Sequence, residues 1–94
     1  MRKNGRTDAN QALIVRELRN LGYTVQVLSS VGQGCPDLVI GMSGRNLLAE
    51  VKDPHQPPSK RKLTPEEKAW HENWRGQVSV IEKTEDVLKL LCMK

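Results

Sequence analysis

The stretch CPDLVIGMSGRNLLAEVK, residues 35–52, decides the fold of this chain. Two apolar runs stand on either side of Ser43-Gly44, a dipeptide that favours a tight turn between antiparallel strands. A two-residue turn at this position pairs Met42 with Arg45. We therefore predict a β-hairpin over these residues.

Three charged residues fall on one face of the predicted hairpin. Counting outward from the turn places Asp37 opposite Glu50, and such partners have Cβ atoms about 4.5–5.5 Å apart. Because side chains alternate along a strand, Lys52 points to the same side as Glu50. The other face is apolar and carries Leu38, Ile40, Leu47, Ala49 and Val51. A slip of one residue would bury all three charges, so this pattern fixes the register.

Two carboxylates and an ammonium group on one side of a sheet suit phosphodiester hydrolysis. Carboxylate oxygens are ligands that Mg²⁺ prefers, and a lysine can orient water and offset charge on a phosphate. A Glu-x-Lys triplet alone is a weak signal, so the prediction depends on Pro36-Asp37, the hairpin and the shared face together. We predict that Asp37, Glu50 and Lys52 are the catalytic residues of a metal-dependent nuclease.

The charge of the chain favours a nucleic-acid partner. Its 94 residues make one small domain with a net charge of +4 and a pI near 9.3. Residues 1–62 hold ten Lys/Arg against five Asp/Glu, and residues 63–94 hold five against six. Phosphate contacts are expected first from Arg6, Lys60, Arg61 and Lys62, with Arg2, Lys3, Arg16 and Arg19 as further candidates. One Tyr, two Trp and no Phe argue against a stacking platform for single strands.

The residues before the hairpin predict one helix and one strand. Thr7 or Asp8 can cap a helix that runs to about Leu21. Residues 24–28 alternate in polarity and predict a strand. Residues 29–35 contain two glycines and predict a flexible loop.

The residues after the hairpin predict a loop, two helices and a further strand. Residues 53–62 are rich in proline and basic residues and predict a mobile loop. Thr64-Pro65-Glu66-Glu67 predicts a helix start with a capping box, and Gly76 ends that helix. A strand over residues 77–82 and a helix capped by Thr84 follow. The order α-β-β-β-α-β-α predicts an α/β fold in which helices flank a mixed four-stranded sheet.

We predict structural roles for the tryptophans and for one of the two histidines. Trp70 and Trp74 lie four residues apart on one helix face and are predicted to pack in the core. His71, on the same helix, is predicted to be structural. His55 follows the catalytic lysine closely and is a candidate for contact with substrate or water.

Two motifs resemble the PD-(D/E)XK nuclease superfamily. They are Gly-x-Gly-x-Pro-Asp-Leu at residues 32–38 and Leu-Leu-Ala-Glu-Val-Lys at residues 47–52. Together with residues 61–76, they make the chain similar to the stand-alone virus-type replication-repair nuclease (VRR-NUC) domains of phages. The resemblance covers residues 8–91 and treats residues 1–94 as one domain.

The resemblance implies a restriction-endonuclease-like fold and hydrolysis of DNA that depends on Mg²⁺ or Mn²⁺. It also implies a homodimer that acts on branched, flap or Holliday-junction DNA in phage replication or repair. Carried onto this sequence, Asp37 and Glu50 are metal ligands and the Val51 carbonyl is a further oxygen donor. Lys52 orients or helps deprotonate the attacking water. No organic cofactor is expected.

The first helix departs from the family pattern. Related phage sequences carry a glutamate where this chain has Leu13. Gln11 is the first candidate for support of the site from this helix, because helical spacing turns it toward the sheet. Glu17, on the flank of the helix, is the second.

Other readings of the chain stay open. Leu13 in place of an acid favours a DNA-binding module that keeps the nuclease fold without turnover. A small interaction protein with a basic surface is a third hypothesis. The first residues show no secretory signal and no apolar run is long enough for a membrane helix, so we expect a protein of the bacterial or phage-host cytoplasm. Cys35 and Cys92 are then expected to be reduced.

Overall fold

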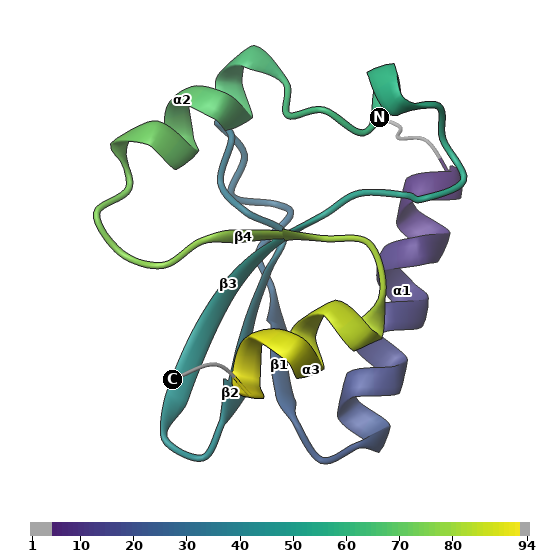
Figure 1. The fold of residues 1–94 in the computed structure, drawn as a ribbon, viewed down its shortest axis with the longest axis vertical. Coiled ribbons are helices and arrows are strands. Elements are labelled where there is room, and N and C mark those ends of the chain that lie inside the picture. The colour runs from purple at the N-terminus through teal and green to yellow at the C-terminus, as the bar shows by residue number, and fades with distance from the viewer. Residues whose placement is uncertain (1–4, 93–94) are drawn as a thin grey trace.

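The computed structural model describes residues 5–92, with side chains from residue 9 onward. Four strands form one mixed sheet in the order β1-β2-β3-β4, and the helices pack around it (Figure 1). The elements are α1 (Gly5–Asn20), β1 (Thr24–Val27), β2 (Leu38–Met42), β3 (Arg45–Val51), η1 (Pro58–Lys60), α2 (Pro65–Asn73), β4 (Ser79–Ile81) and α3 (Thr84–Cys92). This order confirms the predicted α/β fold. The short η1 helix, within the predicted mobile loop, was not anticipated.

The β2–β3 hairpin has the predicted turn and register. Met42 pairs with Arg45, and Leu38 pairs with Ala49. Ser43 and Gly44 both have positive φ, 55° and 78°, as a type I′ turn requires. The twist of this turn matches that of the flanking strands, so the local sequence alone specifies the pairing.

The outer strands pair with the hairpin in opposite senses. β1 runs antiparallel to β2, whereas β4 runs parallel to β3. A parallel neighbour requires a crossover, and the segment that contains η1 and α2 provides it (Figure 1). The first turn of α2 is thereby brought to the end of β3.

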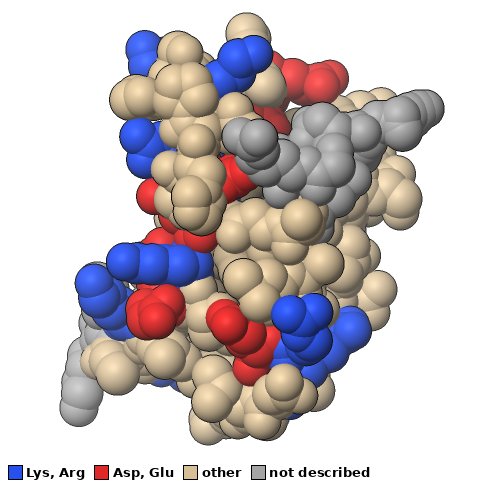
Figure 2. Space-filling view, turned by 90° about the vertical axis from the view of Figure 1, so that its right-hand side faces the viewer, with Lys and Arg blue, Asp and Glu red and all other residues tan. Residues whose placement is uncertain are grey.

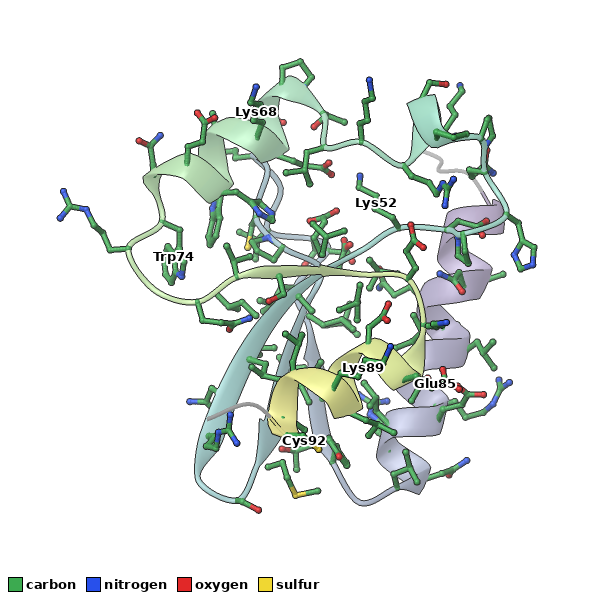
Figure 3. All side chains as sticks on the ribbon, in the orientation of Figure 1. Lys52, Lys68, Trp74, Glu85, Lys89 and Cys92 are labelled. Carbon is green, nitrogen blue, oxygen red and sulfur yellow. The ribbon has the colours of Figure 1, made fainter. Side chains whose placement is uncertain are left out.

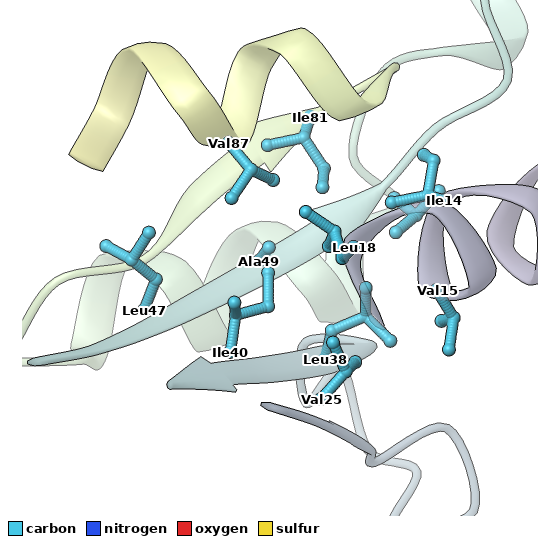
Figure 4. Packing of buried hydrophobic residues seen from close by; sticks show 11 residues of the cluster. Ile14, Val15, Leu18, Val25, Leu38, Ile40, Leu47, Ala49, Ile81 and Val87 are labelled. Atoms are coloured by element: carbon cyan, nitrogen blue, oxygen red, sulfur yellow. The ribbon is translucent and has the colours of Figure 1, made fainter. Parts of the chain in front are cut away.

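The hydrophobic core lies between the sheet and the helices α1 and α3 (Figure 4). It comprises Ile14, Val15, Leu18, Val25, Leu38, Ile40, Leu47, Ala49, Val51, Ile81 and Val87. All five apolar residues predicted for one hairpin face belong to it, none more than 6% exposed. Full burial of each large aliphatic side chain stabilises the fold by about 1.5–3 kcal/mol. The core therefore holds the opposite, charged face in a fixed place.

Three predicted element boundaries were wrong. α1 begins at Gly5, so Thr7 and Asp8 lie inside its first turn and neither is the cap. α2 ends at Asn73, before the predicted stop at Gly76. β4 begins at Ser79, two residues after the predicted start. Gln77 pairs with β3 through its side chain: its Oε1 accepts from the Leu48 N–H at 2.7 Å, and its Nε2 donates to the Leu48 carbonyl at 2.8 Å.

The predicted core role of the two tryptophans was also wrong. Trp74 is the C-cap of α2 and is 45% exposed. Its ring stacks on Trp70, with centroids 4.6 Å apart and planes 20° apart. The pair packs on itself because α2 lies away from the side of the sheet that α1 and α3 cover. Neither ring is part of the buried cluster.

Candidate active site

The hairpin register brings Asp37 and Glu50 together at the end of the β2–β3 pair. Asp37 follows the buried Pro36 and precedes β2 by one residue. Its Oδ2 accepts a hydrogen bond from the Val51 N–H at 2.8 Å, which fixes the carboxylate against β3. Glu50, within β3, is 3% exposed. Two acids are therefore held close together at a largely buried position.

Glu50 is an acid in an environment that opposes its charge. Burial, the nearby charges of Asp37 and Glu67, and hydrogen bonds with these two carboxyl groups raise the pKa of Glu50 to about 9. Its Oε1 is buried and has no hydrogen-bond partner among the described residues. A buried oxygen without a partner is costly. A divalent cation held by Asp37 and Glu50 would supply that partner and offset the repulsion, so the residues present fit such an ion.

Lys52, directly after β3, contacts Glu50 and a third acid, Glu67 of α2. Its Nζ lies 3.8 Å from Glu50 Oε2 and 2.7 Å from Glu67 Oε1. Figure 3 shows Lys52 in the space between the end of β3 and the start of α2. The structure thus places Asp37, Glu50 and Lys52, the three catalytic residues suggested by the sequence, in one group.

Glu67 belongs to this group, although the sequence suggested only a helix cap. The predicted capping box is present: Thr64 Oγ1 accepts from Glu67 N–H at 3.1 Å, and Glu67 Oε1 accepts from Thr64 N–H at 2.9 Å. Burial raises the pKa of Glu67, but hydrogen bonds from Lys52 and the Thr64 N–H outweigh it, and the net shift is downward. Glu67 is therefore the ionised partner of Lys52.

Gln11 of α1 reaches the acid pair through one hydroxyl group. Its Nε2 donates to Ser29 Oγ at 3.1 Å, and that oxygen lies 3.4 Å from Asp37 Oδ1. Ser29 was not predicted to take part. The backbone brings it there, because Leu28 N–H donates to the Asp37 carbonyl at 2.7 Å and aligns the loop with the start of β2.

A second α1 residue, Asn10, was also missed. Its side-chain amide donates to the carbonyls of Lys52 and Glu82, at 3.0 and 3.3 Å. Asn10 therefore joins the backbone just after β3 to the backbone just after β4. An Asn in the second turn of a helix carries no sequence signal for such a contact.

Glu17, the second first-helix candidate, is not brought to this group. It accepts a short hydrogen bond from Thr84 Oγ1, at the start of α3. Its contact joins α1 to α3, and Glu17 lies six residues after Gln11 along the helix. Leu13 is 40% exposed.

The predicted DNA-binding residues have unequal surroundings. Lys60 and Lys62 are exposed, whereas Arg61 is partly buried with its Nη1 3.5 Å from Glu82 Oε2. The side chain of Arg6 lies outside those that the structure describes. Figure 2 shows that Lys and Arg side chains on one side of the molecule gather in separate groups with acids between them.

The two histidines differ in exposure. The His55 side chain is 85% exposed, and its Nδ1 lies 3.3 Å from Oδ1 of the buried Asp53. His71 is partly buried on α2, and its Nε2 has no hydrogen-bond partner among the described residues. Among the described residues, neither ring is hydrogen-bonded to Asp37, Glu50 or Lys52, and the roles suggested for both remain predictions.

Comparison with known proteins gives one informative match. A solved structure of a "VRR_NUC domain" is similar to this chain, with a TM-score of 0.64 and 28% identity over 92% of this chain and 94% of that chain. No family model matches, and no curated protein sequence does. Within residues 5–92, no helix has the length and hydrophobicity needed to cross a membrane.

Proposed function

The chain has the fold of a VRR-NUC nuclease domain, and from this premise we propose that it is a metal-dependent DNA endonuclease that hydrolyses phosphodiester bonds. One observation carries the proposal. Glu50 is buried beside a second acid, with an oxygen that lacks a partner among the described residues and a lysine within 3.8 Å. Such a costly arrangement is expected where charge is needed for chemistry.

Asp37 and Glu50 would hold Mg²⁺ or Mn²⁺, with the Val51 carbonyl as a further oxygen ligand. The Val51 N–H points to Asp37, and the N–H and carbonyl of one strand residue face the same neighbouring strand. When bound, the ion would polarise the phosphate and acidify a bound water. Hard oxygen ligands favour these two ions over zinc.

The protein's own groups would position the attacking water and the metal-binding carboxylate. Lys52 presents its ammonium group to the attacking water and to the charge that develops on the phosphate. The Gln11–Ser29 pair holds one oxygen of Asp37, while the Val51 N–H holds the other. Asp37 would thereby keep one orientation during turnover.

DNA is the proposed substrate, and Lys60, Arg61, Lys62 and Arg6 are the proposed phosphate contacts. We infer a homodimer, because two cuts in a duplex or junction need two sites and one small domain covers little DNA. Branched, flap or Holliday-junction DNA in phage replication or repair is the substrate class that the family resemblance favours. Sedimentation as a monomer at micromolar concentration, with and without DNA, would contradict the dimer.

The proposed location is the cytoplasm of a bacterium or a phage host. Cys35 and Cys92 are free thiols. Burial and the charges of Glu50 and Asp37 raise the pKa of Cys35, which keeps it a neutral thiol beside the acids. A reducing compartment suits such a residue.

The test is a cleavage assay on labelled linear, nicked, flap and four-way DNAs with Mg²⁺, Mn²⁺, Ca²⁺ or a chelator. We expect cuts only with Mg²⁺ or Mn²⁺, and none by Asp37→Ala. Glu85→Ala is the matched control, because Glu85 is an exposed acid on α3 and lies well away from Lys52 (Figure 3). Metal-dependent cutting by Asp37→Ala would refute the assignment of the site.

The second candidate function is a DNA-binding module without turnover, which Leu13 favours. The same panel separates the two functions. Tight, salt-sensitive binding with no cleavage by any metal would support the binding module. Absence of DNA binding would favour an interaction protein instead.

A further inference from the structure

The ammonium group of Lys52 lies between two carboxyl groups from different parts of the chain. Its Nζ is 2.7 Å from Glu67 Oε1 in α2 and 3.8 Å from Glu50 Oε2 in β3. The Lys52 side chain is 12% exposed, so salt and water screen these contacts less than they would on the surface. The shorter, hydrogen-bonded contact is the one to Glu67.

Glu67 is itself held from several sides. Its Oε1 also accepts from the Thr64 N–H, and its own N–H donates to Thr64 Oγ1. The same turn of α2 packs on the glycine loop that leads to Asp37: a Cβ at Gly34 would lie 2.5 Å from the Glu66 carbonyl oxygen. The loop that presents one acid therefore touches the helix turn that presents Glu67.

We propose that Glu67 is a positioning residue that fixes the Lys52 ammonium group for DNA cleavage, an inference that rests on the proposed function. A divalent cation at Glu50 and the ammonium group repel each other, and both are attracted to the same carboxylate. Glu67 gives Lys52 a second, shorter anchor outside the Asp37–Glu50 pair. The lysine then keeps its place when Glu50 is engaged by metal.

Two simpler roles for Glu67 do not account for its contacts. A helix cap requires the bond to Thr64 N–H but no ion pair with Lys52. A third metal ligand would have to point with Asp37 and Glu50 at one place. Within the described part of the chain, no three Asp, Glu, His or Cys side chains are arranged to hold one ion.

The proposal is tested with two variants that separate the cap from the ion pair. Glu67→Gln keeps an amide oxygen for the cap, since Gln also serves in a capping box, but removes the charge. Thr64→Ala removes the hydroxyl that caps the helix while the backbone N–H still reaches Glu67. We compare single-turnover cleavage at saturating Mg²⁺ and DNA, DNA affinity in Ca²⁺, and the metal-free Tm.

We expect Glu67→Gln to slow cleavage roughly ten- to hundred-fold, the cost of a misplaced catalytic group, with DNA affinity and Tm nearly unchanged. Thr64→Ala should lower Tm by several degrees and leave the cleavage rate within about two-fold when it is measured well below that Tm. A residue that only caps the helix would lower Tm when it is changed and would not slow cleavage at a nearly unchanged Tm.

A further readout does not depend on cleavage. The Lys52 ammonium signal in a proton–nitrogen NMR spectrum, assigned by its absence in Lys52→Ala, should be visible in the metal-free wild type and lost in Glu67→Gln. If wild type cleaves and Glu67→Gln cleaves equally fast, this inference is overturned while the proposed function stands. If wild type cleaves no DNA with any metal, the proposed function fails and this inference falls with it.

Discussion

Near the end of β3, two neighbouring residues on opposite faces are both hidden from water but are chemically opposite. Ala49 is 1% exposed and faces the core, whereas its neighbour Glu50 is 3% exposed and faces the acid group. Burial of the apolar face stabilises the fold. Burial of Glu50 opposes its ionisation and raises its pKa to about 9. The comparison teaches that the apolar face stabilises the fold, and that the rigid fold keeps the acids of the charged face in place.

The largest expected effect is on the charged face. Asp37→Asn keeps an oxygen that can accept from the Val51 N–H but removes one of the paired charges. We expect cleavage to fall by at least about 10³-fold, as when one member of a catalytic unit is removed, because metal binding depends on both acids. Stability should stay near that of wild type, since Asn still accepts the Val51 N–H bond that holds this position against β3. A large loss in both activity and stability would break the comparison between the faces.

On the apolar face, a substitution should lower stability much more than it lowers the cleavage rate of the folded protein. Ile40 is 1% exposed, and Ile40→Ala should lower the free energy of unfolding by about 2–5 kcal/mol, because a cavity replaces its side chain. A small domain has about 5–15 kcal/mol in total, so urea denaturation will show the change clearly. Cleavage should fall only in proportion to the fraction unfolded. Val39→Ala, on the same strand and the opposite face, is the matched control and should cost less.

The pH dependence of stability should report the charged face directly. Glu50 has a folded-state pKa near 9, above its ordinary value of 4.5, so its stabilising contribution is complete below about pH 4.5 and is lost as pH rises toward 9. Metal-free protein should therefore lose several degrees of Tm between pH 5.5 and 8.5, and Glu50→Gln should lose much less. Mg²⁺ should restore Tm most at the higher pH. Equal slopes for wild type and Glu50→Gln would show that Glu50 does not titrate in this range.

The hairpin could be predicted because its information is local. Ser43-Gly44 specifies the turn, and the alternation on either side fixes which residues share a face. Asp37, Glu50 and Lys52 follow from counting along two adjacent strands. No other segment has to be placed to bring them together.

The supporting residues could not be predicted because their contacts depend on tertiary packing. Glu67 meets a lysine 15 residues away, and Asn10 meets a carbonyl 42 residues away. A capping box already explains Glu67 locally, so nothing in the sequence indicates a second role for it. Ser29 sits in a loop whose path is set by its bond to the start of β2. The exposed tryptophan was misassigned because spacing shows that two residues share a helix face but does not show what covers it.

The smallest expected effect concerns that tryptophan and asks whether α2 adds a second core on the charged side of the sheet. Trp74 is 45% exposed and contacts Trp70 through ring stacking, an interaction of about 0.5–1.5 kcal/mol beyond area burial. Trp74→Ala should therefore cost far less stability than Ile40→Ala, although its side chain is much larger. Urea denaturation followed by circular dichroism avoids the altered fluorescence. A loss of stability as large as that of Ile40→Ala would mean that a hydrophobic core also holds the charged side of the sheet. Stability would then not come from the apolar face alone.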